Sequence, residues 1–219
     1  MTVTSIKTGA DDNVRRIAFS DGSLFTFKIY YLPPLFTDET LYTPGIAEGR
    51  EISADEEAGF RFASACLRAE KAALQLIARA EQTVFGLSRK LKKRGHDSAC
   101  IGAVISQLCA LDLLDDRRYA RLWLESRLNR QASSPRRLLA ALHARGIDRH
   151  DAEAAIKETI DSEAEQRLLA RFAERLQRRQ SFRKRTSGDY DESSARRSLR
   201  YTLKGEGFST AAIQIFFDE

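Results

Sequence analysis

A glycine-centred pattern that occurs three times limits the possible folds of this chain more than any other feature. Around Gly95, Gly146 and Gly207, leucines stand four and eight residues before the glycine. Apolar residues stand six and ten residues after it, the smallest of them being Ala152. An aspartate or serine stands two residues after each glycine. The glycines are 51 and 61 residues apart, so the pattern predicts a tandem array of helical units.

Each copy of the pattern predicts the end of one helix and the start of the next. Glycine suits the left-handed position after a helix, and aspartate or serine suits an N-cap. In the middle copy, Asp116 is expected to cap a first helix whose apolar face holds Tyr119, Leu122 and Trp123. Ser134, followed by proline, is expected to start the second helix. A third helix follows the glycine, so this unit has three helices.

The N-terminal part has a different pattern, which predicts a β-hairpin. Val14–Phe19 and Leu24–Tyr31 are rich in β-branched and aromatic residues, and an Asp-Gly turn signal lies between them. Val3–Lys7 is a candidate third strand. A capping-box pattern at Ser53 predicts that a helix follows from about Ala54.

These patterns together predict a mostly α fold. It consists of three tandem three-helix repeats, similar to helix-turn-helix units, in an elongated curved array after a small β-hairpin and helix. The expected divisions are residues 1–69 for the hairpin and helix, then 70–112, 113–161 and 162–219 for the three repeats. The polar segment Gln180–Ser194 is expected to form a long loop in the third repeat.

Composition excludes several classes of function. The three cysteines lack metal-type spacing, and the three histidines form no ligand motif. No phosphate-binding glycine loop occurs, and Asp115-Asp116 is better explained by helix capping than by acid–base chemistry. No apolar run approaches the ~20 residues of a membrane span. We therefore expect a cytoplasmic, non-enzymatic protein with no cofactor, no metal and no membrane contact.

Basic residues are the candidate binding groups, since the net charge is +5 and arginines gather in each repeat. Any single arginine is adequately explained by a solvated helix face with i, i+4 ion pairs. As a set, they suit an acidic protein surface or a phosphate backbone. The residues expected to bind a partner or DNA are Lys92, Lys93, Arg94, Arg117, Arg118, Arg121, Arg127, Arg130, Arg136, Arg137, Arg178, Arg179, Arg183, Lys184 and Arg185.

The middle unit also resembles a known family. Its LLDDRRYARLWLESRL and SSPRRLLAALHARGID segments are similar to the signature of RecX, the bacterial regulator of the RecA recombinase. Two departures are His96, where an aromatic or aliphatic residue is usual, and Gln131–Ser134, where glycines are usual. The residues that carry the match are Leu114, Asp115, Asp116, Tyr119, Ala120, Arg127, Pro135, Arg136, Arg137, Arg145, Gly146 and Ile147.

The resemblance implies a function in recombination, DNA repair and the SOS response. A RecX-like protein would bind the RecA nucleoprotein filament in its groove, as a monomer, and inhibit ATP-driven strand exchange. Single- or double-stranded DNA would be a further partner, and the arginines could meet RecA, DNA phosphates or both. The alternative is a DNA-binding helical-repeat protein that acts independently of RecA.

Overall fold

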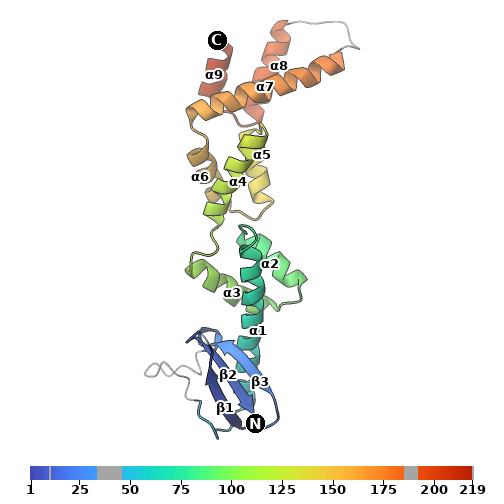
Figure 1. The fold of residues 1–219 in the computed structure, drawn as a ribbon. Helices are drawn as coiled ribbons and strands as arrows, with labels where there is room; N and C mark the ends of the chain where they lie inside the picture. Colours follow the sequence, from blue (N-terminus) through green and yellow to red (C-terminus); the bar gives the residue numbers. More distant parts are fainter. Residues whose placement is uncertain (10, 34–45, 185–191, 219) are drawn as a thin grey trace. The chain divides into compact units, whose positions relative to one another are not determined.

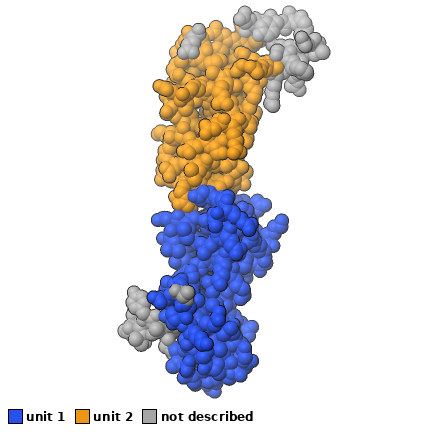
Figure 2. Space-filling model, in the orientation of Figure 1, with its two compact units in different colours: residues 1–114 blue, residues 115–219 orange. Residues whose placement is uncertain are grey.

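The computed structural model describes residues 1–9, 11–33, 46–184 and 192–218 (Figure 1). Within these ranges the side chains of residues 179–184 and 192 are left undescribed. The chain divides into two compact units, Met1–Leu114 and Asp115–Glu219 (Figure 2). Each unit is described by itself below. The further division into four parts that the sequence suggests stays a prediction.

Unit 1 begins with a three-stranded antiparallel sheet in the order β1-β2-β3, so the candidate third strand is confirmed. The turn before β3 contains Gly22 at φ +83°, a conformation that favours glycine. The last strand is shorter than expected, because the chain turns into a 3₁₀ helix after Lys28. The bounds are β1 Val3–Thr8, β2 Val14–Phe19, β3 Leu24–Lys28 and η1 Ile29–Tyr31.

Helix α1 (Ala54–Ile77) packs against this sheet and supplies the centre of its core. A complete capping box at Ser53 and Glu56 starts the helix, as expected. Phe60 is fully buried, and its ring lies 5.3 Å from that of Phe27. The helix continues without a break across the expected boundary at residues 69 and 70, so one element serves both the sheet and the helices that follow. These helices are α2 (Val84–Lys93) and α3 (Ser98–Ala110).

Unit 2 consists of two helical groups with one buried apolar cluster each. The first cluster, which includes Leu124, Leu138 and Leu142, lies among α4–α6. The second, which includes Phe172 and Phe208, lies among α7–α9. The bounds are α4 Asp116–Arg130, α5 Pro135–His143, α6 Arg149–Thr159, α7 Ser162–Lys184, α8 Glu192–Gly205 and α9 Thr210–Asp218.

The glycine-centred pattern has the structural role that the sequence predicts. Gly95, Gly146 and Gly207 have φ values of +83°, +82° and +88°, where other residues are strained. The leucines four and eight residues before each glycine are buried. Asp97 and Asp148 are N-caps, each accepting a backbone N–H hydrogen bond. The mostly helical fold with a small N-terminal sheet is thus confirmed.

Two expectations for α4 are wrong. The N-cap is Asp115 rather than Asp116, because the helix begins at residue 116 and the Asp115 carboxylate accepts the N–H bonds of the first turn. Of the expected apolar face, Tyr119 and Trp123 do pack against the α4–α6 cluster as partly buried side chains. Leu122 is 47% exposed, however, and Ala120 and Leu124 are the fully buried residues.

The long loop expected over Gln180–Ser194 is wrong at both ends. Helix α7 continues to Lys184, and α8 already begins at Glu192. Arginine, lysine and glutamine are good helix formers, which accounts for the longer α7. Residues 185–191 lie outside the described residues.

A partly buried polar cluster around the Glu70 carboxylate joins the sheet to α1. The Lys28 ammonium lies 2.8 Å from the Glu70 carboxylate, which also accepts a 3.0 Å hydrogen bond from the Tyr30 hydroxyl. Burial lowers the pKa of Lys28, but its hydrogen bonds to Glu70 and Tyr30 outweigh burial and raise that pKa. Burial also raises the pKa values of Tyr30 and Tyr31.

We expect unit 1 to lose stability above about pH 10. The folded state holds these three protons more tightly than the unfolded chain, whose lysine and tyrosine pKa values are about 10. Their stabilisation is therefore complete below that pH and is lost as the pH rises through the folded pKa values. Thermal unfolding followed by circular dichroism should show it, with the single tryptophan, Trp123, reporting unit 2 separately. A melting temperature of unit 1 that is unchanged from pH 8 to about pH 11 would contradict this.

Candidate partner-binding surface

The basic residues expected at the end of α2 form an exposed cluster. Lys92 and Lys93 lie in the last turn of the helix, and Arg94 is its C-cap. Their positive charge interacts favourably with the negative end of the helix dipole. The Arg94 guanidinium also reaches the Ala72 carbonyl at 3.5 Å. This cluster is open to an anionic partner, but its position also has a purely structural explanation.

The arginines of α4 differ in what they contact. Arg117 forms a 3.0 Å ion pair with Glu158 of α6, which fastens two helices of the same group. Arg118 is half-buried. Arg121 and Arg127 are exposed, and their guanidinium groups form no ion pair within the described part of the chain. Arg121 and Arg127 are therefore the freer of the four to meet a partner.

Arg136 and Arg137, at the start of α5, hold the two helical groups of unit 2 together. The Arg136 backbone N–H donates to the Glu206 carbonyl at 3.0 Å, and its guanidinium donates to the Gly205 carbonyl at 3.1 Å. Arg137 forms a 3.1 Å ion pair with Glu206. The buried Ser134 hydroxyl donates to the same carboxylate at 2.5 Å. Both arginines thus have an intramolecular role in addition to the binding role that the sequence suggests.

Gly207 adds a steric condition to this junction. A Cβ atom at that position would lie 3.3 Å from the Arg136 backbone nitrogen, which is tighter than ordinary packing. The positive φ of Gly207 already favours glycine. Gly207 therefore follows the end of α8 and, because it has no side chain, also lets the start of α5 approach closely.

A basic hollow of about 320 Å³ lies between the end of α4 and one side of α7. We call it the α4–α7 hollow, and its charged lining residues are Arg130, Arg171, Glu174, Arg175 and Arg178. Arg175 lies over the Phe172 ring at 5.2 Å, and Arg178 forms a 2.5 Å ion pair with Glu174. Among the described lining residues, four arginines and one glutamate give a net positive charge, so the hollow suits an anionic group.

The sequence identified only part of this hollow. Arg130 and Arg178 are among the expected binding residues, and the sequence also favours contact of the basic block from Arg175 to Arg185 with an acidic partner; Arg171 is not singled out for binding. The spacing of positions 171, 175 and 178, at i, i+4 and i+7, places them on one helix face and would have added Arg171. Arg179, Arg183 and Lys184 belong to α7, but their side chains are outside the described part, and Arg185 lies outside the described residues altogether.

Other kinds of site find no support in the described residues. Among them, no three or more histidine, cysteine, aspartate or glutamate side chains are grouped to hold a metal ion. Cys66, Cys100 and Cys109 form no disulfide with one another, and burial raises the pKa of Cys66. In the part of the chain with described structure, no helix has the length and apolar character that crossing a membrane requires.

Two solved structures share this fold. One, titled "Crystal structure of regulatory protein RecX", is 20% identical, has a TM-score of 0.71, and aligns over 100% of this chain and 99% of its own. The crystal structure of RecX from Lactobacillus salivarius is 22% identical with a TM-score of 0.58, over 70% of this chain and 95% of its own. At these identities the likeness defines the class only: a protein of helical repeats.

Sequence comparison identifies the family within that class. Residues 115–156 match the family model described as RecX, second three-helix domain. The regulatory protein RecX of Treponema pallidum (strain Nichols) is 37% identical over 118 residues, or 54% of this chain and 72% of the relative. That of Mycobacterium tuberculosis (strain ATCC 25177 / H37Ra) is 32% identical over 147 residues, or 67% and 82%. The chain belongs to the RecX family of regulatory proteins.

Proposed function

We propose that this protein is a non-enzymatic inhibitor of the RecA recombinase. It acts in the cytoplasm as a monomer, binds in the groove of the RecA–DNA filament, and limits ATP-driven strand exchange during recombination, DNA repair and the SOS response. Membership of the RecX family supports a regulatory role. The observation on this chain that carries the proposal is the α4–α7 hollow.

The hollow supports binding to a surface with dense negative charge. Arginine forms paired hydrogen bonds with carboxylate or phosphate groups, and the planar guanidinium loses little freedom in doing so. Acidic side chains of RecA and phosphates of its bound DNA both present such groups. Two further exposed arginines, Arg121 and Arg127 of α4, extend the positive charge along the helix that leads to Arg130.

The alternative, sequence-selective DNA binding without RecA, has weaker support in unit 2. The third helix of a three-helix unit would enter the major groove with its N-terminal residues. In α6 this end carries Asp148 and Asp151, and Arg149 is bound to Glu153 at 2.7 Å. Two carboxylates at this end would be repelled by the phosphates, so we favour the filament.

We expect the rate of ATP hydrolysis by RecA on single-stranded DNA to fall as this protein is added. The protein should also sediment with RecA–DNA filaments, and DNA without RecA is the control. Unchanged hydrolysis together with no co-sedimentation at saturating protein would contradict the proposal. Salt-sensitive, sequence-selective binding to duplex DNA, with no effect on RecA, would favour the alternative.

A further inference from the structure

We infer that unit 1 contains a second docking site, a groove beside β3 that takes an acidic peptide in extended conformation as an additional strand of the sheet. The groove has a volume of about 490 Å³ and lies between β3 and α1. We call it the β3–α1 groove. Its defining residues are Leu24 and Thr26 of the strand and Arg61, Leu67, Arg68 and Lys71 of the helix.

The first support is the open edge of the sheet. Strand β3 pairs only with β2 in the described sheet. Phe19 donates its backbone N–H to the Ser23 carbonyl, and Ile29 donates its N–H to the Asn13 carbonyl. With the register of the two strands, these bonds make Phe25 and Phe27 the residues of β3 that exchange hydrogen bonds with β2. Because such pairs alternate in an antiparallel ladder, the backbone groups of Leu24, Thr26 and Lys28 point away from β2. Outside the pairing with β2, no backbone bond to Leu24 or Thr26 is formed within the described residues. The Lys28 carbonyl faces the first turn of η1, so Leu24, Thr26 and the Lys28 N–H are the groups that can pair with an added strand.

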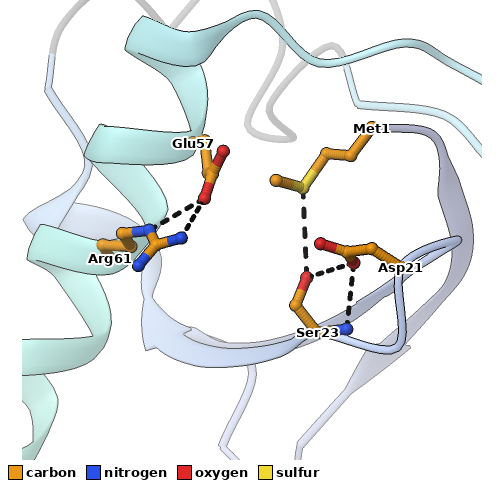
Figure 3. A network of polar contacts seen from close by, with 5 residues as sticks. All are labelled: Met1, Asp21, Ser23, Glu57 and Arg61. Atoms are coloured by element: carbon orange, nitrogen blue, oxygen red, sulfur yellow. Dashed lines mark hydrogen bonds and ion pairs between the residues drawn. The ribbon is translucent and has the colours of Figure 1, made fainter.

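The second support is the charge of the facing helix. Positions 61, 68 and 71 recur at helical spacing and line one side of the groove, and no acidic residue lines it. Arg61 is exposed although it is paired with Glu57 through a 2.8 Å Nε–Oε1 bond. Figure 3 shows this pair on α1 and, in the turn between β2 and β3, Asp21 accepting hydrogen bonds from Ser23. Arg68 and Lys71 form no ion pair within the described part of the chain, so their charges are available to carboxylates.

The dimensions of the two sides match. At a rise of 1.5 Å per residue, the ten steps from Arg61 to Lys71 cover about 15 Å. Five residues of a strand such as Leu24–Lys28 cover a similar length, about 13 Å from first to last, at roughly 3.3 Å per residue. An added strand of this length directs alternate side chains towards α1, where acidic ones meet the three cations. Apolar ones meet Leu24, which is 56% exposed.

These features favour a peptide over a nucleic acid or a second copy of this chain. A nucleic acid has no backbone N–H and C=O groups that continue a β-ladder. A second copy would bring its own Arg61, Arg68 and Lys71 against the first set, and like charges repel. An acidic extended segment of another protein satisfies both the open edge and the positive charge.

The test is binding of a fluorescent peptide of alternating glutamate and valine, about nine residues long, to the full protein without RecA or DNA. We expect saturable binding at low salt, measured by fluorescence anisotropy. Arg68→Glu with Lys71→Glu should weaken it by about tenfold or more. Lys7→Glu with Arg79→Glu makes the same change of charge at exposed residues of unit 1 outside the groove; this variant is the matched control and should bind as the natural sequence does. Circular dichroism checks that both variants fold.

Hydrogen exchange separates strand addition from simple charge attraction. Binding should slow exchange at the amides of Leu24, Thr26 and Lys28 and leave Phe25 and Phe27, which already pair with β2, unchanged. A peptide N-methylated at alternate residues keeps its charge and should lose most of its affinity. Equal affinity of that peptide would overturn the inference. So would displacement by oligothymidylate without amide protection, or dimerisation of the protein through the same residues.

Discussion

Replacement of Phe172 by alanine is expected to lower the free energy of unfolding of unit 2 by about 3–5 kcal/mol, the usual range for removing a large buried aromatic ring. The Phe172 side chain is fully buried at the centre of the α7–α9 cluster. Its ring lies 5.5 Å from that of Phe208 and 5.6 Å from the Arg137 guanidinium of α5. The substitution therefore leaves a cavity in one group of helices and loosens the junction with the other.

Urea denaturation followed by tryptophan fluorescence and circular dichroism would measure the change. Trp123 is half-buried in the α4–α6 group, with the Arg145 guanidinium 4.4 Å from its ring. Its fluorescence therefore shows whether loss of the α7–α9 core spreads to α4–α6. Tyr201→Ala is the matched control, because Tyr201 is 82% exposed and its loss should change stability by no more than ~0.5 kcal/mol. A loss below about 1 kcal/mol for Phe172→Ala would contradict the expected cavity.

Local signals explain why the helix ends and the sheet could be predicted. The left-handed glycines, the aspartate caps and the capping box at Ser53 depend on a few neighbouring residues. A sequence therefore displays them without knowledge of the tertiary fold. The buried leucines before each glycine follow from the same helical spacing, so the core positions were predictable as well.

The errors arise where two local solutions are equally good. Asp115 and Asp116 are chemically identical caps, and only the observed start of α4 selects Asp115. On α4, helical spacing places Leu122 beside Tyr119 and Trp123, but the buried face is centred on Ala120 and Leu124 instead. In both cases tertiary packing decides between alternatives that the sequence leaves nearly equal.

The α4–α7 hollow could be predicted only in part, for a related reason. The helix face formed by positions 171, 175 and 178 is a local feature, but the proximity of Arg130 is not. It depends on the docking of the two helical groups through Ser134, Arg137 and Glu206. These contacts join positions about 70 residues apart, and no spacing rule links them. The same docking gives Arg136 and Arg137 a role that their exposed, basic character does not reveal.

Charge reversal in the α4–α7 hollow, Arg130→Glu with Arg171→Glu, is expected to weaken binding to RecA–DNA filaments by about tenfold to a hundredfold. The change replaces attraction by repulsion at two of the four arginines, and like charges facing each other across an interface cost several kcal/mol. The prediction rests on the proposed function. Co-sedimentation with filaments and inhibition of RecA ATP hydrolysis would measure the effect. The remaining affinity should depend less on salt than that of the natural sequence.

The matched control is Arg197→Glu with Lys204→Glu, which makes the same change of net charge at exposed basic residues of unit 2 outside the hollow. If total charge alone governs binding, both double variants lose affinity equally, and the hollow is not the site. Stability provides the second comparison. Arg130 and Arg171 take part in no ion pair among the described residues, so their reversal should leave urea denaturation nearly unchanged. Arg137→Glu, by contrast, places two carboxylates together at Glu206 and should destabilise unit 2. Weaker filament binding by the hollow variant with unchanged stability therefore separates a binding surface from a structural one.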